Sequence, residues 1–194
     1  MLQFRIVLRE TEPPIWRRIA VPADYSFWDL HIAIQDAMGW RDSHLHEFEV
    51  TDPSHGRSVL VGIPDEEFPD ERPTLRGWEI PVGPYLGHPG AAAIYRYDFG
   101  DGWEHTVSFE GPGPAPAPGA RRPLCLGGER ACPPEDVGGV PGFEAFLEAI
   151  ADPEHDEHAA MRQWAGGRYD PRRFDADKVR FDDPAKRWRM AFAR

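Results

Sequence analysis

One motif constrains the fold of this chain more than any other: two alternating segments flank the dipeptide Asp101-Gly102. Residues 92–98 and 103–110 alternate apolar and polar side chains with the period of two that is typical of a β-strand. Asp-Gly is favoured in two-residue type I′ turns, because both central positions require a positive φ. The sequence therefore predicts a long antiparallel hairpin.

The same hairpin contains the polar residues that most suggest a functional site. In the two-residue register, Asp98 lies directly opposite His105, where it would orient the imidazole and raise the pKa of His105. Such a pair commonly supports a general base or a metal ligand, so Asp98, His105 and Glu104 are the candidate catalytic residues. A three-residue loop would instead place Tyr97 opposite His105. In a purely structural interpretation the polar residues shape the turn and Trp103 fills the core.

Two strands are predicted at the N-terminus. Residues 2–8 alternate cleanly, and residues 15–21 form a second alternating run after the break at Pro13-Pro14. Because the connection is short, an antiparallel pair is the simplest arrangement.

A helix is predicted over residues 27–38, where apolar side chains recur at helical spacing. Ser26 followed by Asp29 resembles a capping box, and Gly39 is a natural C-cap. A strand around residues 46–50 completes a ββαβ order, which is compatible with a β-grasp-like start. The fold class is therefore α+β, with a mixed or antiparallel sheet.

The sequence of the C-terminal half predicts a loop, several helices and a tail. Residues 111–119 contain Gly, Pro and Ala and predict a flexible loop. Helices are expected around residues 143–150, from Asp152-Pro153 to Gly166, and over residues 174–181. Residues 1–182 should form a single domain, and residues 183–194 a basic, aromatic tail.

Composition narrows the functional classes. The net charge of -11 makes generic nucleic-acid binding unfavourable, because the phosphate backbone would be repelled. No apolar run approaches 18 residues, which argues against a membrane span, and the N-terminus lacks a signal-peptide layout. Two cysteines in a chain of this length indicate a reducing compartment. We expect a cytoplasmic protein.

Four residues are candidate metal ligands. His44 and His46 are two apart and would share a face of a strand, where both could bind one ion. Cys125 and Cys132 do not match the tight Cys-x-x-Cys spacing of common zinc modules, although they could join the histidines across the fold. A divalent metal such as zinc is the candidate cofactor. The alternatives are histidines that cap a loop and free buried thiols.

A binding groove is expected between the hairpin and residues 125–136. This hypothesis depends on clustered Trp, His, Asp and Arg side chains that form no complete catalytic set. The candidate lining residues are Trp103, Asp101, Arg130, Glu135 and Asp136. The expected partner is a protein or a small molecule.

Five motifs in order resemble those of a known family. They are Pro13-Pro14-Ile15-Trp16-Arg17-Arg18, Asp29-Leu30-His31 through Ala37-Met38-Gly39-Trp40, His44-Leu45-His46-Glu47-Phe48, Tyr97-Asp98-Phe99-Gly100-Asp101-Gly102-Trp103-Glu104-His105 and Gly128-Glu129-Arg130-Ala131-Cys132-Pro133-Pro134-Glu135-Asp136. From about residue 2 to residue 181 the chain resembles the plasmid pRiA-type ORF-three family, also labelled insertion-element passenger TnpR-like proteins.

The resemblance implies an association with mobile elements, and a resolvase role is suggested by name, without an established biochemical activity. The family's cysteine motif often reads Cys-Pro-Pro-Glu-Asp-Cys, whereas Val137 occupies the last position here. A metal site that needs this third thiol is therefore not expected. The acidic charge also argues against a resolvase, as does the lack of a serine in an Arg-rich strand-to-helix setting.

Three functional hypotheses follow. The leading one is a ligand- or partner-binding module. The alternative is a metal-assisted hydrolase or nuclease that uses His44, His46, Asp98 and His105. The second alternative is a DNA-associated accessory protein that binds through the basic residues of 186–194.

Overall fold

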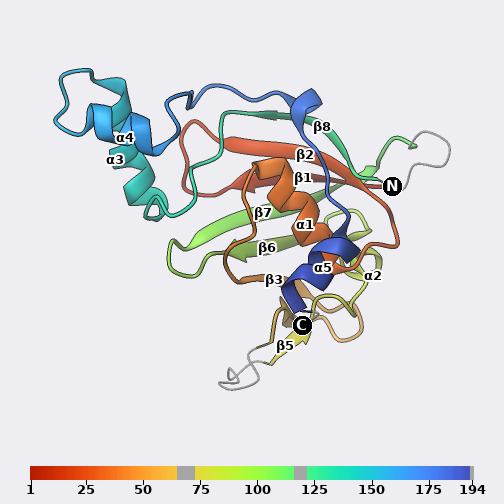
Figure 1. Cartoon of the computed structure of the whole chain (residues 1–194). Helices are drawn as coiled ribbons and strands as arrows, with labels where there is room; N and C mark the ends of the chain where they lie inside the picture. The colour runs from red at the N-terminus through yellow and green to blue at the C-terminus, as the bar shows by residue number, and fades with distance from the viewer. Residues whose placement is uncertain (65–72, 116–121, 193–194) are drawn as a thin grey trace.

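The computed structural model describes residues 1–64, 73–115 and 122–192 (Figure 1). The strands are β1 (Leu2–Leu8), β2 (Ile15–Val21), β3 (His46–Thr51), β4 (Ser58–Gly62), β5 (Thr74–Arg76), β6 (Ala92–Tyr97), β7 (Trp103–Pro112) and β8 (Leu124–Glu129). The helices are α1 (Phe27–Met38), α2 (Val82–Leu86), α3 (Gly139–Ala151), α4 (His158–Trp164), the 3₁₀-helix η1 (Ala176–Lys178) and α5 (Pro184–Phe192).

The strands form one mixed sheet in the order β5-β4-β3-β6-β7-β1-β2-β8. Every neighbouring pair is antiparallel except β4 and β5, which are parallel. The predicted α+β class, the ββαβ order and the long β6–β7 hairpin are confirmed. In the sheet, β1 and β2 are neighbours, whereas β6 and β7 separate β3 from them.

Helix α1 begins and ends where local chemistry predicts. The Ser26 hydroxyl accepts a hydrogen bond from the Asp29 backbone N–H at 3.2 Å, and the Asp29 carboxylate accepts one from the Ser26 N–H at 2.9 Å. At the other end Gly39 has a φ of 95°, which favours glycine, and its N–H donates to Gln35. The capping box and the C-cap together limit the helix to Phe27–Met38.

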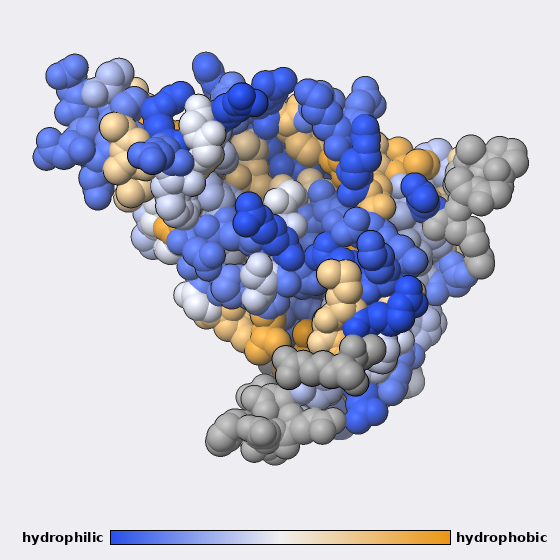
Figure 2. Space-filling model, viewed as in Figure 1, coloured by the Kyte–Doolittle hydropathy of each residue, from blue (hydrophilic) through white to orange (hydrophobic). Residues whose placement is uncertain are grey.

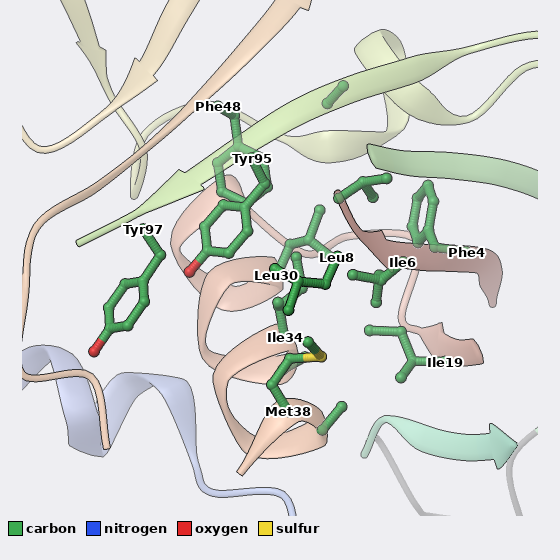
Figure 3. Packing of buried hydrophobic residues seen from close by; sticks show 14 of the residues in the cluster. Phe4, Ile6, Leu8, Ile19, Leu30, Ile34, Met38, Phe48, Tyr95 and Tyr97 are labelled. Atoms are coloured by element: carbon green, nitrogen blue, oxygen red, sulfur yellow. The ribbon is translucent and has the colours of Figure 1, made fainter. Parts of the chain in front are cut away.

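The core lies between α1 and one face of the sheet (Figure 3). Leu30, Ile34 and Met38 extend from α1 toward the apolar side chains of β1 and β2, including Phe4 and Ile19. In β1 and in the first five residues of β2, every second side chain is buried on this face, as the period-two pattern predicts.

The other face of the sheet is polar. Arg96 of β6 donates to Glu47 and Glu49 on β3 and to Glu104 on β7, at 2.8–2.9 Å. This ion-pair network lies outside the core and does not contribute to the site described below.

The C-terminal segments differ from the sequence prediction. Helix α4 begins at His158 rather than beside Pro153, because Asp152 accepts hydrogen bonds from the backbone of residues 154 and 155 in a local turn. Residues 174–181 contain only η1, and Phe174 packs instead on the Arg17 guanidinium. A local turn at Asp152 therefore replaces the start of one predicted helix, and a tertiary contact of Phe174 accompanies the loss of most of the other.

The predicted tail forms α5, which packs on the outer side of α1 (Figure 1). The indole N–H of Trp28 donates to the carbonyl of Pro184 at 3.1 Å. Arg187 pairs with Asp42 at 3.3 Å and with Asp182 at 2.8 Å. Arg187 of the tail therefore forms its ion pairs with acidic residues of the same chain.

The predicted 111–119 loop is described only in part. Strand β7 extends to Pro112, and residues 116–119 lie outside the described residues. Among the described residues, no helix is long and apolar enough to cross a membrane.

Candidate functional site

The β6–β7 hairpin has a five-residue loop. Tyr97 pairs with Trp103 and Tyr95 pairs with His105, so neither the two-residue nor the three-residue register is correct. Asp98 instead adopts a φ of 55°, and its carboxylate accepts hydrogen bonds from the backbone N–H groups of Gly100 and Asp101. The Asp98 side chain therefore stabilises a loop of residues 98–102, which is longer than the two-residue Asp-Gly turn.

This register separates the three candidate catalytic residues. His105 is fully buried, its Nδ1 lies 3.4 Å from the Tyr95 carbonyl, and its Nε2 has no hydrogen-bond partner. Burial lowers the pKa of His105 to about 3, opposite to the predicted rise. Glu104 lies on the polar face of the sheet, where it accepts from Arg9 and Arg96. His105 is thus a neutral core residue.

Asp98 instead belongs to a cluster with His44 and Asp136. The His44 Nε2 lies 3.0 Å from Asp136 Oδ1 and 3.4 Å from Asp98 Oδ2. One ligand atom from each residue lies within 4.8 Å of those from the other two. Asp98 is nearly buried, whereas 71% of the Asp136 side chain is exposed, so one side of the cluster is open to solvent.

Three separate segments meet at this cluster. His44 lies in the link between α1 and β3, Asp98 begins the hairpin loop, and Asp136 lies in the link between β8 and α3. The Asp101 carboxylate accepts from the Gly138 N–H at 3.2 Å, which joins the hairpin loop to the third segment. The backbone around the cluster is therefore held by hydrogen bonds.

Tyr97 and Glu135 support the cluster from the core side. The Tyr97 hydroxyl donates to Glu135 at 2.7 Å and accepts from the Ser43 N–H at 3.0 Å. Glu135 also accepts from the Arg41 N–H at 3.0 Å. Burial, and then the hydrogen bond to Glu135, raises the pKa of Tyr97 well above its ordinary value, so the phenol remains a proton donor.

His46 is not part of this cluster, so the predicted His44–His46 pair is wrong. His44 precedes β3, and the alternation of a strand does not extend to it. His46 is buried beside His31, and Asp42 lies within 4.8 Å of both. The two imidazole planes lie within 7° of each other at a centroid distance of 3.4 Å. In-plane lone pairs of stacked rings do not converge on one ion.

The two cysteines are free thiols. Cys125 lies in β8 and Cys132 in the link that follows it, and in the described part of the chain neither belongs to a group of candidate metal ligands. Burial raises the pKa of both thiols, and the nearby Arg17 guanidinium opposes that rise. Neutral thiols are poor metal ligands, so the cluster of His44 fits a metal better than the cysteines do.

A cavity of about 790 Å³ lies beside the cluster. It runs between residues 131–136, the end of α1 and residues 164–178. Of the five residues predicted to line a groove, Glu135 and Asp136 line this cavity. Figure 2 shows hydrophobic side chains in a hollow with a hydrophilic rim on this side of the molecule.

The other three residues predicted for the groove lie elsewhere. Trp103 is 1% exposed in the core because its position on β7 faces α1. Asp101 is bonded to Gly138, and Arg130 lines different cavities near α3. The hairpin therefore contributes its loop to the cluster but none of these residues to the cavity wall.

Arg17 also lines this cavity and is not among the site residues predicted from the sequence. Its guanidinium is buried in the cavity wall and donates to the carbonyls of Ala37, Trp16 and Glu129 at 2.8–2.9 Å. No carboxylate among the described residues pairs with it. The signal in the sequence was a lone cation on the apolar face of the 15–21 run.

The comparisons with known proteins agree with the fold. An uncharacterized protein, y4hQ, from Sinorhizobium fredii (strain NBRC 101917 / NGR234) is 38% identical over 192 residues, which cover 97% of this chain and 94% of y4hQ. The crystal structure of a protein of unknown function, MM3350 from Methanosarcina mazei Go1, has a TM-score of 0.83 and 37% identity. That match covers 93% of this chain and 97% of MM3350.

The family model described as plasmid pRiA4b ORF-3-like protein matches residues 1–178. Nearly the whole described fold lies within this match, including His44, Asp98 and Asp136. The chain therefore belongs to the family of plasmid pRiA4b ORF-3-like proteins.

Proposed function

We propose that the protein is a metal-dependent binding module, which holds a divalent cation at His44, Asp98 and Asp136 and binds a small ligand in the adjoining cavity. The main support for this proposal is that one imidazole nitrogen and two carboxylate oxygens lie within 4.8 Å of one another. Asp136 also lines the 790 Å³ cavity, so a ligand there would lie beside the cation.

The origin of the three ligands supports the proposal. Each comes from a different sequence motif: His44 from His-Leu-His-Glu-Phe, Asp98 from the hairpin motif and Asp136 from Pro-Pro-Glu-Asp. His44 and Asp136 are 92 positions apart in the chain. Acidic residues that serve only as solvated surface need not meet at one imidazole from distant segments of the chain.

The ligand types indicate the class of ion. Two carboxylates and one imidazole suit Mn²⁺, Fe²⁺ or Zn²⁺ better than the soft ions that thiolates select. Three protein ligands leave coordination positions for water or for a bound ligand, as in open metal sites. The high exposure of Asp136 allows access to those positions.

Metal titration tests the proposal directly. Untagged protein is treated with a chelator and titrated with Mn²⁺ and Zn²⁺ by calorimetry, with about one bound ion per chain expected. His44→Ala and Asp136→Asn should each weaken binding at least tenfold, because the first removes a ligand and the second replaces a charged carboxylate with a neutral amide. His55→Ala is the matched control, since His55 is an exposed histidine that lies beside a single aspartate.

Two results would refute the proposal. One is a failure of the folded wild-type protein to bind either ion, and the other is unchanged affinity in both His44→Ala and Asp136→Asn. Near-ultraviolet circular dichroism distinguishes loss of a ligand from loss of the fold. Asp136→Asn is the decisive variant, because Asp136 is largely exposed and its amide would be well tolerated.

A metal-assisted hydrolase is the second candidate function, supported by the open side of the cluster. A bound cation lowers the pKa of a coordinated water and so supplies a nucleophile. Turnover of model phosphodiesters and esters should then require metal and disappear in Asp136→Asn. If metal binds without turnover of any substrate, the binding module is the better description.

The proposed hydrolase would not use His46 or His105. His46 stacks on His31, and His105 is buried with a pKa of about 3. DNA association through residues 186–194 has less support, because Arg187 is paired with acidic residues.

A further inference from the structure

A second cavity, of about 740 Å³, is lined by arginines. It lies among α3, α4 and residues 168–173, at the end of the molecule where the α3–α4 pair extends beyond the sheet (Figure 1). The arginines that line it are Arg130, Arg162, Arg168, Arg172 and Arg173. None of the ligands of the proposed metal site lines this cavity.

The concentration of positive charge is unusual for this chain. The whole protein has 22 basic residues and a net charge of -11, yet five of the basic residues line one cavity. Asp170 is the acidic residue in that lining, and it lies 3.8 Å from Arg172. In the described ranges the other four arginines make no ion pair. Like charges around one cavity repel one another, and a bound anion would relieve that repulsion.

Hydrogen bonds hold together the segments that carry the arginines. The Ala131 N–H donates to the Pro171 carbonyl at 3.1 Å, which ties the chain after Arg130 to the 168–173 segment. The Tyr169 hydroxyl donates to the Cys132 carbonyl at 3.1 Å, and the Gly167 N–H donates to the Arg162 carbonyl at 2.7 Å. The fold therefore brings the segments that carry the five arginines to one cavity, where Asp170 pairs with Arg172.

The chemistry of the wall suits phosphate. Guanidinium groups donate two parallel hydrogen bonds to phosphate oxygens, and several of them around one cavity match several phosphate groups. Leu147, Ile150 and Tyr169 add an apolar and aromatic wall beside the charge. The volume lies within the range of small-molecule sites.

We infer that the arginine-lined cavity binds a small ligand with two or more linked phosphate groups, such as a nucleoside diphosphate. A small polyanion responds to the local positive potential within about 8 Å, the screening length at physiological salt. A nucleic-acid strand would extend beyond the cavity over an acidic protein surface, which would repel it. This site goes beyond the proposed metal-dependent function and contains none of the three proposed metal ligands, while Tyr169 and Arg173 line both this cavity and the 790 Å³ cavity.

Calorimetric titration with inorganic pyrophosphate and with ADP tests this inference. The titrations are done in EDTA, so that a cation at His44 cannot hold the phosphates. We expect saturable binding of one molecule per chain, weakened at least tenfold in Arg168→Gln/Arg172→Gln. The matched control is Arg57→Gln/Arg180→Gln, which removes two exposed arginines outside the cavity and should retain the wild-type affinity.

Each other outcome counts against the inference. Absence of binding overturns it, as does equal weakening by the two double variants, which would indicate a general charge effect. Tighter binding of a 16-nucleotide single strand than of ADP would replace it with nucleic-acid recognition. Weaker binding of ADP than of pyrophosphate would overturn the assignment of a nucleoside diphosphate, because the apolar wall would then add nothing to the phosphate contacts. His44→Ala should bind pyrophosphate normally, so failure of the metal site would leave this inference intact.

Discussion

The imidazole rings of His31 and His46 stack face to face, with centroids 3.4 Å apart and planes within 7°. Burial lowers the pKa of both side chains, and for His46 the neighbouring His31 lowers it further. Both rings are therefore neutral at physiological pH. A proton on one ring would lie against a second imidazole in a site with little access to solvent.

The buried histidines predict a loss of stability in acid. Below pH 6.5 the unfolded chain takes up protons that His31, His46 and His105 do not bind in the folded state, so the free energy of unfolding falls as the pH falls. Asp29 and Asp36 raise the free energy of unfolding as the pH falls, because burial raises the pKa of both carboxyls. The pKa of Asp36 rises to about 6. The three histidines should outweigh the two aspartates between pH 6.5 and 4.5.

One variant isolates the contribution of His105. Relative to wild type, His105→Phe should gain about 1.4 kcal/mol of unfolding free energy for each pH unit below 6.5, toward the His105 pKa of about 3. Urea titrations at several pH values measure this difference. Val107→Ala is the control, because Val107 is buried in the same strand and has no titratable group. A pH-independent difference for His105→Phe would contradict the prediction.

Ser26→Ala should destabilise the protein by about 1 kcal/mol. The substitution removes the hydroxyl that accepts from the Asp29 N–H at the start of α1. Chemical denaturation provides the measurement. Ser108→Ala, on a strand and without a described side-chain hydrogen bond, should change stability much less, and equal effects would mean that the cap adds nothing.

Arg17→Met should destabilise the protein by about 2 to 4 kcal/mol, because it leaves three backbone carbonyls without their donor. Those carbonyls belong to α1, β2 and β8, so the loss should loosen the contact of β8 with the sheet. Hydrogen exchange of the β8 amides can detect this. Arg18→Met provides the comparison: Arg18 pairs with Glu110 on the solvent-facing side, and its removal should cost less than about 1 kcal/mol.

Gly139→Ala should weaken metal binding at least tenfold. A Cβ at Gly139 would collide with the Asp101 carbonyl and push the hairpin loop, with Asp98, away from Asp136. The residue also has a φ of 68°, so some stability is lost through backbone strain alone. Gly90→Ala shares that strain at a φ of 82° but has no atom within 4 Å of the new Cβ. Equal metal affinity in the two variants would indicate that the loop position is unimportant.

Local sequence determined the regular elements of the fold. Ser26, Asp29 and Gly39 mark the ends of α1 because each acts on backbone groups within a few positions. The period-two runs of β1, β2 and β7 appear as strands because alternation follows directly from the pleat. Arg17 was visible as a cation on the otherwise apolar face of the 15–21 run, although its partners were not.

The Asp-Gly motif did not reveal the hairpin register, and tertiary structure decided the sites. The hairpin register depends on the positive φ of Asp98 and on the hydrogen bonds of its carboxylate, which outweigh the preference of Asp-Gly for a two-residue turn. The meeting of His44 with Asp136 joins positions 92 apart. Local propensities act over a few residues and do not encode the path of the chain between distant positions. The proposed metal site and the arginine-lined cavity therefore exist only in the folded protein.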